Sequence, residues 1–207
     1  MLLTVNHGPK PPRLTVLAYD MACKRRARRV RRLVDSVHHA KQYSVFEALL
    51  LGGEFRGLLA ELTAYCDLSE DKLAVWWPQG AVRLQWLHGR LSSVACGPRP
   101  AVRTDPEAGL TGVGNFVICY DVSDPAALNA VAAAVASEGA MVQRSVYWLR
   151  VSSQRLAGLI ERCQKHLGGA DRLWAYPLRG AHQLWRIGAE GTSLLPMAAD
   201  RWTRYDR

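Results

Sequence analysis

The chain lacks any run of 18 consecutive apolar residues, although 49% of its residues are hydrophobic. A helix needs about 20 predominantly apolar residues to cross a membrane, so the sequence predicts no membrane span. Residues 1–12 also lack the apolar stretch and the small-residue cleavage site of a secretory signal. We therefore expect a cytoplasmic protein.

Paired cysteine motifs are missing as well. The five cysteines are odd in number and widely spaced, with no Cys-x-x-Cys pair and no histidine at zinc-finger distance; they are Cys23, Cys66, Cys96, Cys119 and Cys163. This spacing argues against a disulfide framework and against a structural zinc site. We expect reduced thiols, most of them buried.

Two further absences concern catalysis and RNA recognition. Ser44 and Ser145 have no nearby His-Asp pattern that could activate a hydroxyl nucleophile, so turn or strand-pairing roles are favoured for both. The Lys/Arg-Gly-aromatic pattern of RRM-type RNA-binding domains is also absent. The sequence thus argues against a serine hydrolase and against an RRM.

The sequence does contain one pattern twice. Tyr19-Asp20 precedes residues 42–46 (Gln-Tyr-Ser-Val-Phe), and Tyr120-Asp121 precedes residues 143–147 (Gln-Arg-Ser-Val-Tyr) by the same 22 positions. Later matches pair Asp71-Lys72-Leu73 with Asp171-Arg172-Leu173, Trp77-Pro78 with Tyr176-Pro177, and Trp86 and Gly89 with Trp185 and Gly188. Such an internal duplication allows one chain to form a surface that two-fold partners normally share. Asp20 and Asp121 are the residues we expect to face each other.

Both copies show the same order of expected elements. Short apolar runs at 14–19 and 115–120 predict buried strands, and apolar spacing of three and four residues after each predicts a helix. A strand pair or bent strand, a second helix, a further strand and one extra strand, at 82–87 and 182–187, complete each copy. The predicted fold class is α+β, with two tandem ferredoxin-like βαββαβ units that each carry an extra C-terminal strand and dock as an intrachain pseudo-dimer.

Proline and glycine content sets the expected boundaries. Residues 90–114 contain three prolines and four glycines and predict a linker. The expected units are therefore 1–89 and 115–188, and residues 189–207 form a basic and aromatic C-terminal tail.

The positive charge is concentrated in the first copy. Residues 1–100 contain 15 Lys and Arg against 8 Asp and Glu, a net +7, whereas residues 101–207 contain 12 against 10, a net +2. Seven cations fall within nine positions, and all lie on the first predicted helix: Lys24, Arg25, Arg26, Arg28, Arg29, Arg31 and Arg32. Like charges on adjacent turns repel, so this run predicts a polyanion-binding surface, with a solvated helix face as the alternative.

Asp20 and Asp121 each end a predicted strand and precede a predicted helix. Two aspartates brought together across a pseudo-two-fold axis could hold one Mg²⁺ against a phosphate, because this ion prefers carboxylate, phosphate and water oxygens. The alternative is that each aspartate caps the helix that follows. The sequence leaves both interpretations open.

These motifs, in this order, resemble the small ferredoxin-fold CRISPR-associated adaptation protein, the second core Cas family. The resemblance covers residues 14–89 well and 115–188 more loosely, and it implies a tandem fusion of two units that are usually separate chains forming a homodimer. It also implies that the extra strand of each unit, at 82–87 and 182–187, covers the sheet edge of the other unit. It further implies a role in antiviral defense, as a subunit that bridges CRISPR integrase subunits and positions double-stranded DNA through phosphate contacts during spacer acquisition.

The same resemblance implies that Asp20 and Asp121 are catalytic metal ligands of an Mg-dependent endonuclease, while the cation run from Lys24 to Arg32 contacts nucleic acid. A scaffold role is favoured over catalysis. The alternative function is a metal-dependent ribonuclease of a toxin-like family with the same fold. Unit two departs from the family pattern because it lacks the cation run and has Arg144 in place of the tyrosine.

Overall fold

The protein is described by a computed structural model that covers residues 11–79, 82–87, 90–95, 113–180 and 183–188. The first half contains β1 (Arg13–Asp20), α1 (Lys24–Asp35), β2 (Ala40–Gln42), β3 (Val45–Leu50), α2 (Gly52–Tyr65), β4 (Lys72–Trp76), β5 (Val82–Leu87) and β6 (Arg90–Ala95). The second half contains β7 (Val113–Asp121), α3 (Pro125–Ala136), β8 (Gly139–Gln143), β9 (Val146–Ser152), α4 (Ser153–Gln164), β10 (Arg172–Leu178) and β11 (Leu184–Gly188).

Both halves have the βαββαβ order and the ferredoxin-like strand arrangement. The first sheet has the order β11-β4-β1-β3-β2, and the second has the order β6-β5-β10-β7-β9-β8. Every pairing is antiparallel, and the central strands β1 and β7 are each flanked by the two strands expected of this fold. The predicted fold class is confirmed.

The two halves exchange strands from near their ends. β5 of the first half pairs with β10 of the second, with Leu173 opposite Trp86, and β11 of the second half pairs with β4 of the first, with Leu73 opposite Ile187. Because β6 pairs with β5, the second sheet includes two strands of the first half, and the first sheet includes one strand of the second. Because an added strand satisfies the backbone groups along an open edge, this exchange confirms the predicted covering of one unit by the other.

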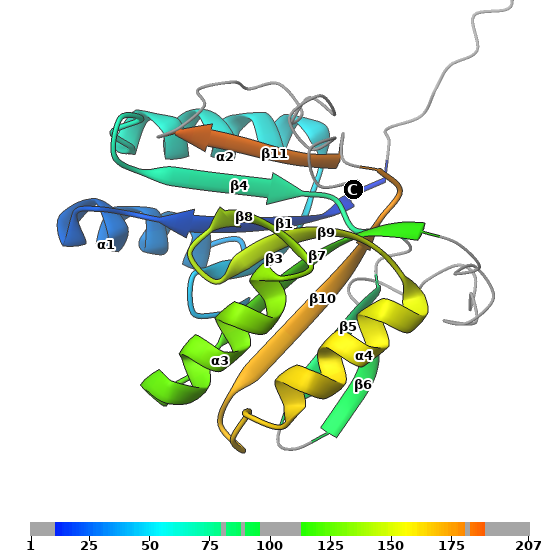
Figure 1. Ribbon diagram of the computed structural model, residues 1–207. Coiled ribbons are helices and arrows are strands. Elements are labelled where there is room, and N and C mark those ends of the chain that lie inside the picture. Colours follow the sequence, from blue (N-terminus) through cyan, green and yellow to red (C-terminus); the bar gives the residue numbers. More distant parts are fainter. Residues whose placement is uncertain (1–10, 80–81, 88–89, 96–112, 181–182, 189–207) are drawn as a thin grey trace, which may run out of the picture.

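Four layers result from this arrangement (Figure 1). Val30 and Leu62 belong to a cluster that packs α1 and α2 on the outer face of the first sheet, and Val131 and Leu159 belong to the matching cluster of α3 and α4. A third cluster joins the inner faces of the two sheets and includes Val16, Trp76, Cys119 and Tyr176. Burial of one continuous apolar core between the sheets holds the halves together as an intrachain pseudo-dimer.

The core between the sheets contains one buried ionic bridge. Glu47 on β3 accepts hydrogen bonds from Arg83 on β5 and from the hydroxyl of Tyr176 on β10, the latter at 2.9 Å. The guanidinium of Arg83 lies 4.2 Å from the ring centroid of Trp174 and also donates to Gln85. The bridge therefore connects the first sheet to the second.

The pseudo-two-fold counterparts of this bridge are apolar or neutral. Strand register places Arg83 opposite Tyr176 by extension of the β5–β10 pairing and Leu184 opposite Trp76, so Leu184 corresponds to Arg83 and Trp76 to Tyr176. The sequence repeat places Trp148 at the position of Glu47. The two halves of the interface thus have different chemistry.

Some sequence-based expectations need correction. Arg90–Ala95 forms strand β6 and β7 begins at Val113, so the expected linker at 90–114 is too long at both ends; residues 96–112 and the predicted tail at 189–207 lie outside the described residues. The residue matches that the sequence repeat gave near the end of each unit are also wrong. Backbone pairing, and not the spacing of the tryptophans, shows which residues of the two halves are equivalent. Register aligns Trp86 with Ile187, not with Trp185, and Trp76 with Tyr176.

Candidate nucleic-acid interface

The cations of α1 are divided among three directions by the helical period of 3.6 residues. Val30 and Val34 are buried, and Arg26 lies near their side of the helix. The remaining six cations are exposed and form two stripes at helical spacing. The groove stripe consists of Lys24, Arg28 and Arg31, and the outer stripe consists of Arg25, Arg29 and Arg32.

Arg26 is engaged within the protein. Its guanidinium forms ion pairs with Asp71 at 2.6 Å and with Glu70 at 2.7 Å, and the Asp71 side chain is fully buried. Ion pairs with a buried carboxylate are costly to break. We therefore assign Arg26 to anchoring α1 against the turn before β4, and the prediction that it contacts nucleic acid remains without structural support.

The buried Asp71 and its counterpart Asp171 tie each strand-to-helix turn in place. The Asp71 carboxylate accepts from the backbone N–H of Ala22 at 2.9 Å and of Asp67 at 2.8 Å. Asp171 accepts from Ser123 at 2.9 Å and from Gly168 at 2.8 Å. In each half, one of these bonds satisfies a backbone N–H group in the turn after β1 or β7, and the other satisfies an N–H group in the loop before β4 or β10.

This arrangement corrects the capping alternative for Asp20 and Asp121. The residue at the start of α1 is Cys23, which makes no side-chain capping bond, and α3 is capped by Asp124, whose carboxylate accepts from Ala127 at 2.7 Å. Asp20 and Asp121 are therefore not the helix caps. Sequence inspection missed Asp71 and Asp171 in this role because each lies about 50 residues from the turn it holds.

Asp20 and Asp121 are both partly exposed at the ends of their strands. Strand register sets Lys72 opposite Asp20 and Arg172 opposite Asp121. Burial raises the pKa of Asp121 above its ordinary value, Arg172 lowers it and Asp171 raises it. Asp20 is not among the charged groups that act on Asp121, so the meeting of the two aspartates stays a prediction.

The donor set does not form a protein cage for Mg²⁺. Across the described parts of the chain, no three His, Cys, Asp or Glu side chains are grouped so that they could hold a metal ion. Asp71 and Asp171, the nearest sequence-matched carboxylates, are occupied by backbone N–H groups. The residues present do not fit a preformed metal centre, and we derive no catalytic step through one.

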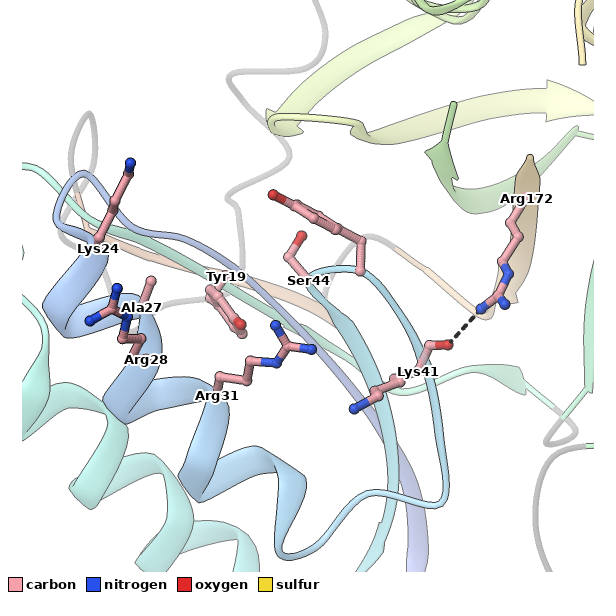
Figure 2. Close-up of a pocket in the computed structure, with 9 residues that line it drawn as sticks. Tyr19, Lys24, Ala27, Arg28, Arg31, Lys41, Ser44 and Arg172 are labelled. Carbon is pink, nitrogen blue, oxygen red and sulfur yellow. Dashed lines mark hydrogen bonds between the residues drawn. The ribbon is translucent and has the colours of Figure 1, made fainter. Parts of the chain in front are cut away.

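A cationic groove does form where α1 faces the β2–β3 hairpin (Figure 2). It has a volume of about 370 Å³ and contains the groove stripe together with Lys41 of β2 and Arg172 of β10. Arg172 comes from the second half of the chain and donates to the backbone carbonyl of Lys41 at 3.3 Å. The groove is therefore lined by five cations from both halves, although Lys41 also pairs with Asp35 at 3.0 Å.

The tip of the β2–β3 hairpin forms one wall of this groove. Tyr43 and Ser44 both line it, and the Ser44 carbonyl accepts from the Tyr19 N–H at 3.2 Å, which fixes the tip against the end of β1. The second half has the same contact between Ser145 and Tyr120 at 3.1 Å. Of the two expected alternatives, each half therefore has the strand pair rather than one bent strand, with a tight turn between the strands.

Sequence reasoning missed Lys41, Tyr43 and Arg172 as groove residues. Lys41 and Tyr43 flank Gln42 in the repeated motif, so the motif itself could have indicated them. Arg172 could be found only from the pseudo-two-fold pairing, because it lies 131 residues from Lys41. The second half offers no equivalent groove stripe, since α3 carries no Lys or Arg.

Comparison with known proteins agrees with the duplicated fold. The sequence profile described as "CRISPR associated protein Cas2" matches residues 13–79 and again residues 115–184. Two proteins named CRISPR-associated endoribonuclease Cas2, from two strains of Thermus thermophilus, are each 39% identical over 75 residues, which covers 36% of this chain and 80% of theirs. The crystal structure of a hypothetical protein from Thermus thermophilus is 30% identical over 33% of this chain and 85% of its own, with a TM-score of 0.32.

Among the described residues, no helix is long and apolar enough to span a bilayer. The family profile matches the chain twice, once on each ferredoxin-like unit, and together the two matches extend over more than half of the 207 residues. The chain therefore belongs to the CRISPR-associated Cas2 family and carries the family's unit twice.

Proposed function

We propose that this protein binds nucleic acid through the cationic groove and serves as a DNA-positioning subunit in CRISPR spacer acquisition, where it bridges integrase subunits. The observation that carries the proposal is the convergence of Lys24, Arg28, Arg31, Lys41 and Arg172 on one open groove. A polyanion of regularly spaced phosphates is the ligand whose charge this surface matches. Membership of the Cas2 family supports the place in CRISPR adaptation.

The groove predicts binding without sequence readout. Lysine and arginine side chains that contact phosphates fix the position of a duplex but do not distinguish its bases. The groove also depends on the docking of the two halves, because Arg172 of the second half lines it together with four cations of the first half. In this proposal the first half supplies most of the phosphate contacts, and the second half supplies one cation and packs against the first.

The decisive experiment compares the groove stripe of α1 with its outer stripe. The groove variant replaces Lys24, Arg28 and Arg31 with Ala, and the matched control replaces Arg25, Arg29 and Arg32 with Ala, so that both lose three charges from the same helix. Each lost phosphate contact lowers the slope of log K against log salt by about 0.9 for a duplex. We expect a slope decrease of about 2 to 3 in the groove variant and a smaller one in the control.

The titration uses short DNA duplexes of several unrelated sequences, followed by fluorescence anisotropy at a series of salt concentrations. Equal weakening by the two variants would show that only net charge matters and would remove the groove from the proposal. Arg26 is left unchanged in both variants, because its ion pairs with Asp71 and Glu70 would confound binding with folding.

A second candidate function is cleavage of RNA, which is the activity in the names of the two Thermus relatives. It is favoured by the position of Asp20 and Asp121 at matching strand ends, and it requires at least one of these carboxylates to act on a phosphodiester. Asp20→Asn and Asp121→Asn separate the candidates. We expect duplex insertion by the integrase to survive both substitutions, whereas a nuclease that uses these carboxylates loses hydrolysis in at least one of the two variants.

A further inference from the structure

Tyr43 is the one side chain lining the cationic groove that stands largely free in solvent as an aromatic ring. It is 81% exposed, the most exposed of the large hydrophobic residues in the described parts of the chain. Tyr19 also lines the groove, but its ring stacks on Phe46 with centroids 5.6 Å apart. Tyr43 makes no ring contact with a described residue, so packing does not account for it.

The backbone of Tyr43 is also unusual. Its φ angle is +47°, in the left-handed region that glycine and asparagine adopt more readily than an aromatic residue does. In the second half the left-handed residue is Ser145 instead, with φ of +59°, and the residue at the position of Tyr43 is Arg144. The first hairpin therefore holds an aromatic ring at a position where stability favours another residue.

The hairpin backbone places the ring beside the cations. The Ser44 carbonyl accepts from the Tyr19 N–H, which ties the hairpin tip to the end of β1, and both tyrosines line the groove. Lys24, Arg28 and Arg31 stand along α1 on the facing wall, as Figure 2 shows. An exposed aromatic ring among cations is the arrangement by which proteins hold unpaired nucleotides, because each base can stack on the ring while its phosphate is neutralised.

We propose that Tyr43 is a stacking platform for an unpaired nucleobase, so that the groove prefers nucleic acid with a single-stranded segment over a fully paired blunt duplex. This inference rests on the proposed binding of nucleic acid in the groove. A base inside an intact duplex offers no free face to the ring, whereas a base in an overhang does. The preference is independent of base identity, because every base has an aromatic face.

The test compares Tyr43→Gly with wild type on two DNA ligands, a blunt duplex and the same duplex with a short single-stranded overhang. Glycine suits the left-handed backbone, so a loss of binding in this variant is not a loss of folding. We expect the affinity for the overhang ligand to fall roughly 5- to 100-fold, while the affinity for the blunt duplex stays the same. The same loss is expected with an RNA overhang.

Two controls isolate the ring. Tyr43→Phe keeps the aromatic face and is expected to bind the overhang ligand like wild type; a loss equal to that of Tyr43→Gly would assign the effect to the hydroxyl and overturn the proposal. Arg144→Gly alters the matching hairpin of the second half and is expected to leave the overhang-to-blunt ratio unchanged.

A fluorescent base reports the stack directly. With 2-aminopurine at the first unpaired position, binding of wild type is expected to quench its emission and binding of Tyr43→Gly is expected to leave it bright. Unchanged affinity and equal quenching in Tyr43→Gly would refute the stacking role alone, while intact binding after loss of Lys24, Arg28 and Arg31 would refute the groove itself. The two failures are therefore distinguishable.

Discussion

The buried bridge between Glu47 and Arg83 allows a quantitative prediction about what holds the two sheets together. Glu47 has 0% and Arg83 7% of its surface exposed, and the bridge also takes the Tyr176 hydroxyl. Replacing Glu47 with Leu removes the carboxylate that pairs with Arg83, and it leaves the guanidinium buried over the Trp174 ring, where it donates to Gln85. Removing one member of a buried ion pair costs about 3 to 5 kcal/mol.

Replacing both members is expected to have a very different effect. The second half of the interface has buried Trp148 and Leu184 at the corresponding places, and neither of these side chains can form an ion pair. Substitution of a buried pair by well-packed apolar residues is often neutral or stabilising by about 1 to 4 kcal/mol. The Tyr176 hydroxyl loses its acceptor Glu47 in both variants, so we expect the double variant Glu47→Leu, Arg83→Leu to recover much, but not all, of the stability that Glu47→Leu loses.

Urea denaturation of wild type, the two single variants and the double variant measures the coupling energy of the pair. Tryptophan fluorescence and far-ultraviolet circular dichroism should report the same midpoint if the docked halves unfold together. As a control, Arg155→Leu removes an ion pair to Glu138 in which Arg155 is 65% exposed, and its cost is expected to stay below about 1 kcal/mol. Additive losses in the double variant would refute the reasoning.

Two further predictions concern single ionisable groups. Burial raises the pKa of Asp121, so its carboxyl group binds a proton more tightly in the folded state than in the unfolded state. The stability that this protonation contributes is present below about pH 3.8 and is lost as pH rises through the pKa of the folded state. Asp121→Asn should therefore melt at a higher temperature than wild type at neutral pH but not in acid, and an equal or lower melting temperature at neutral pH would contradict this. Backbone N–H groups of Arg26 and Arg25 lower the pKa of Cys23, whereas burial raises the pKa of Cys66 and of Cys163 to about 11 each. Peptide mapping after brief maleimide treatment should find Cys23 modified before the other two, and equal labelling would argue against this order.

Much of the fold could be predicted because the chain contains the same sequence pattern twice. The repeated strand-helix order and the apolar spacing were enough to predict two ferredoxin-like units, and the family resemblance added the exchange of strands between them. Fine register was not predictable in the same way. Trp86 and Trp185 look equivalent in sequence, yet the backbone pairing matches Trp86 to Ile187, because the spacing of one residue type does not fix the hydrogen-bond register of a strand.

The candidate site was predicted only in part. The cation run on α1 indicated a polyanion surface, but not that Arg26 turns inward to Asp71, 45 residues away. Arg172 and Tyr43 join the groove through contacts between distant segments, which a single sequence does not display. Glu47 could have been noticed, since it is a lone carboxylate within the apolar strand Val45–Leu50, and burial of such a group requires a partner.

The exchange of β5 and β11 has a consequence for how this chain can change. In a dimer of identical subunits every substitution appears on both sides of the symmetry axis, so a buried carboxylate must find two cations and an aromatic ring must fit two hairpins. Here one covalent chain supplies both sides, and a residue is altered once. Glu47 corresponds to Trp148, Tyr43 corresponds to Arg144, and the cations of α1 have no match on α3. The covalent link thus makes the assembly asymmetric. The groove of the first half can hold a ligand, while the corresponding surface of the second half can change independently and take another function.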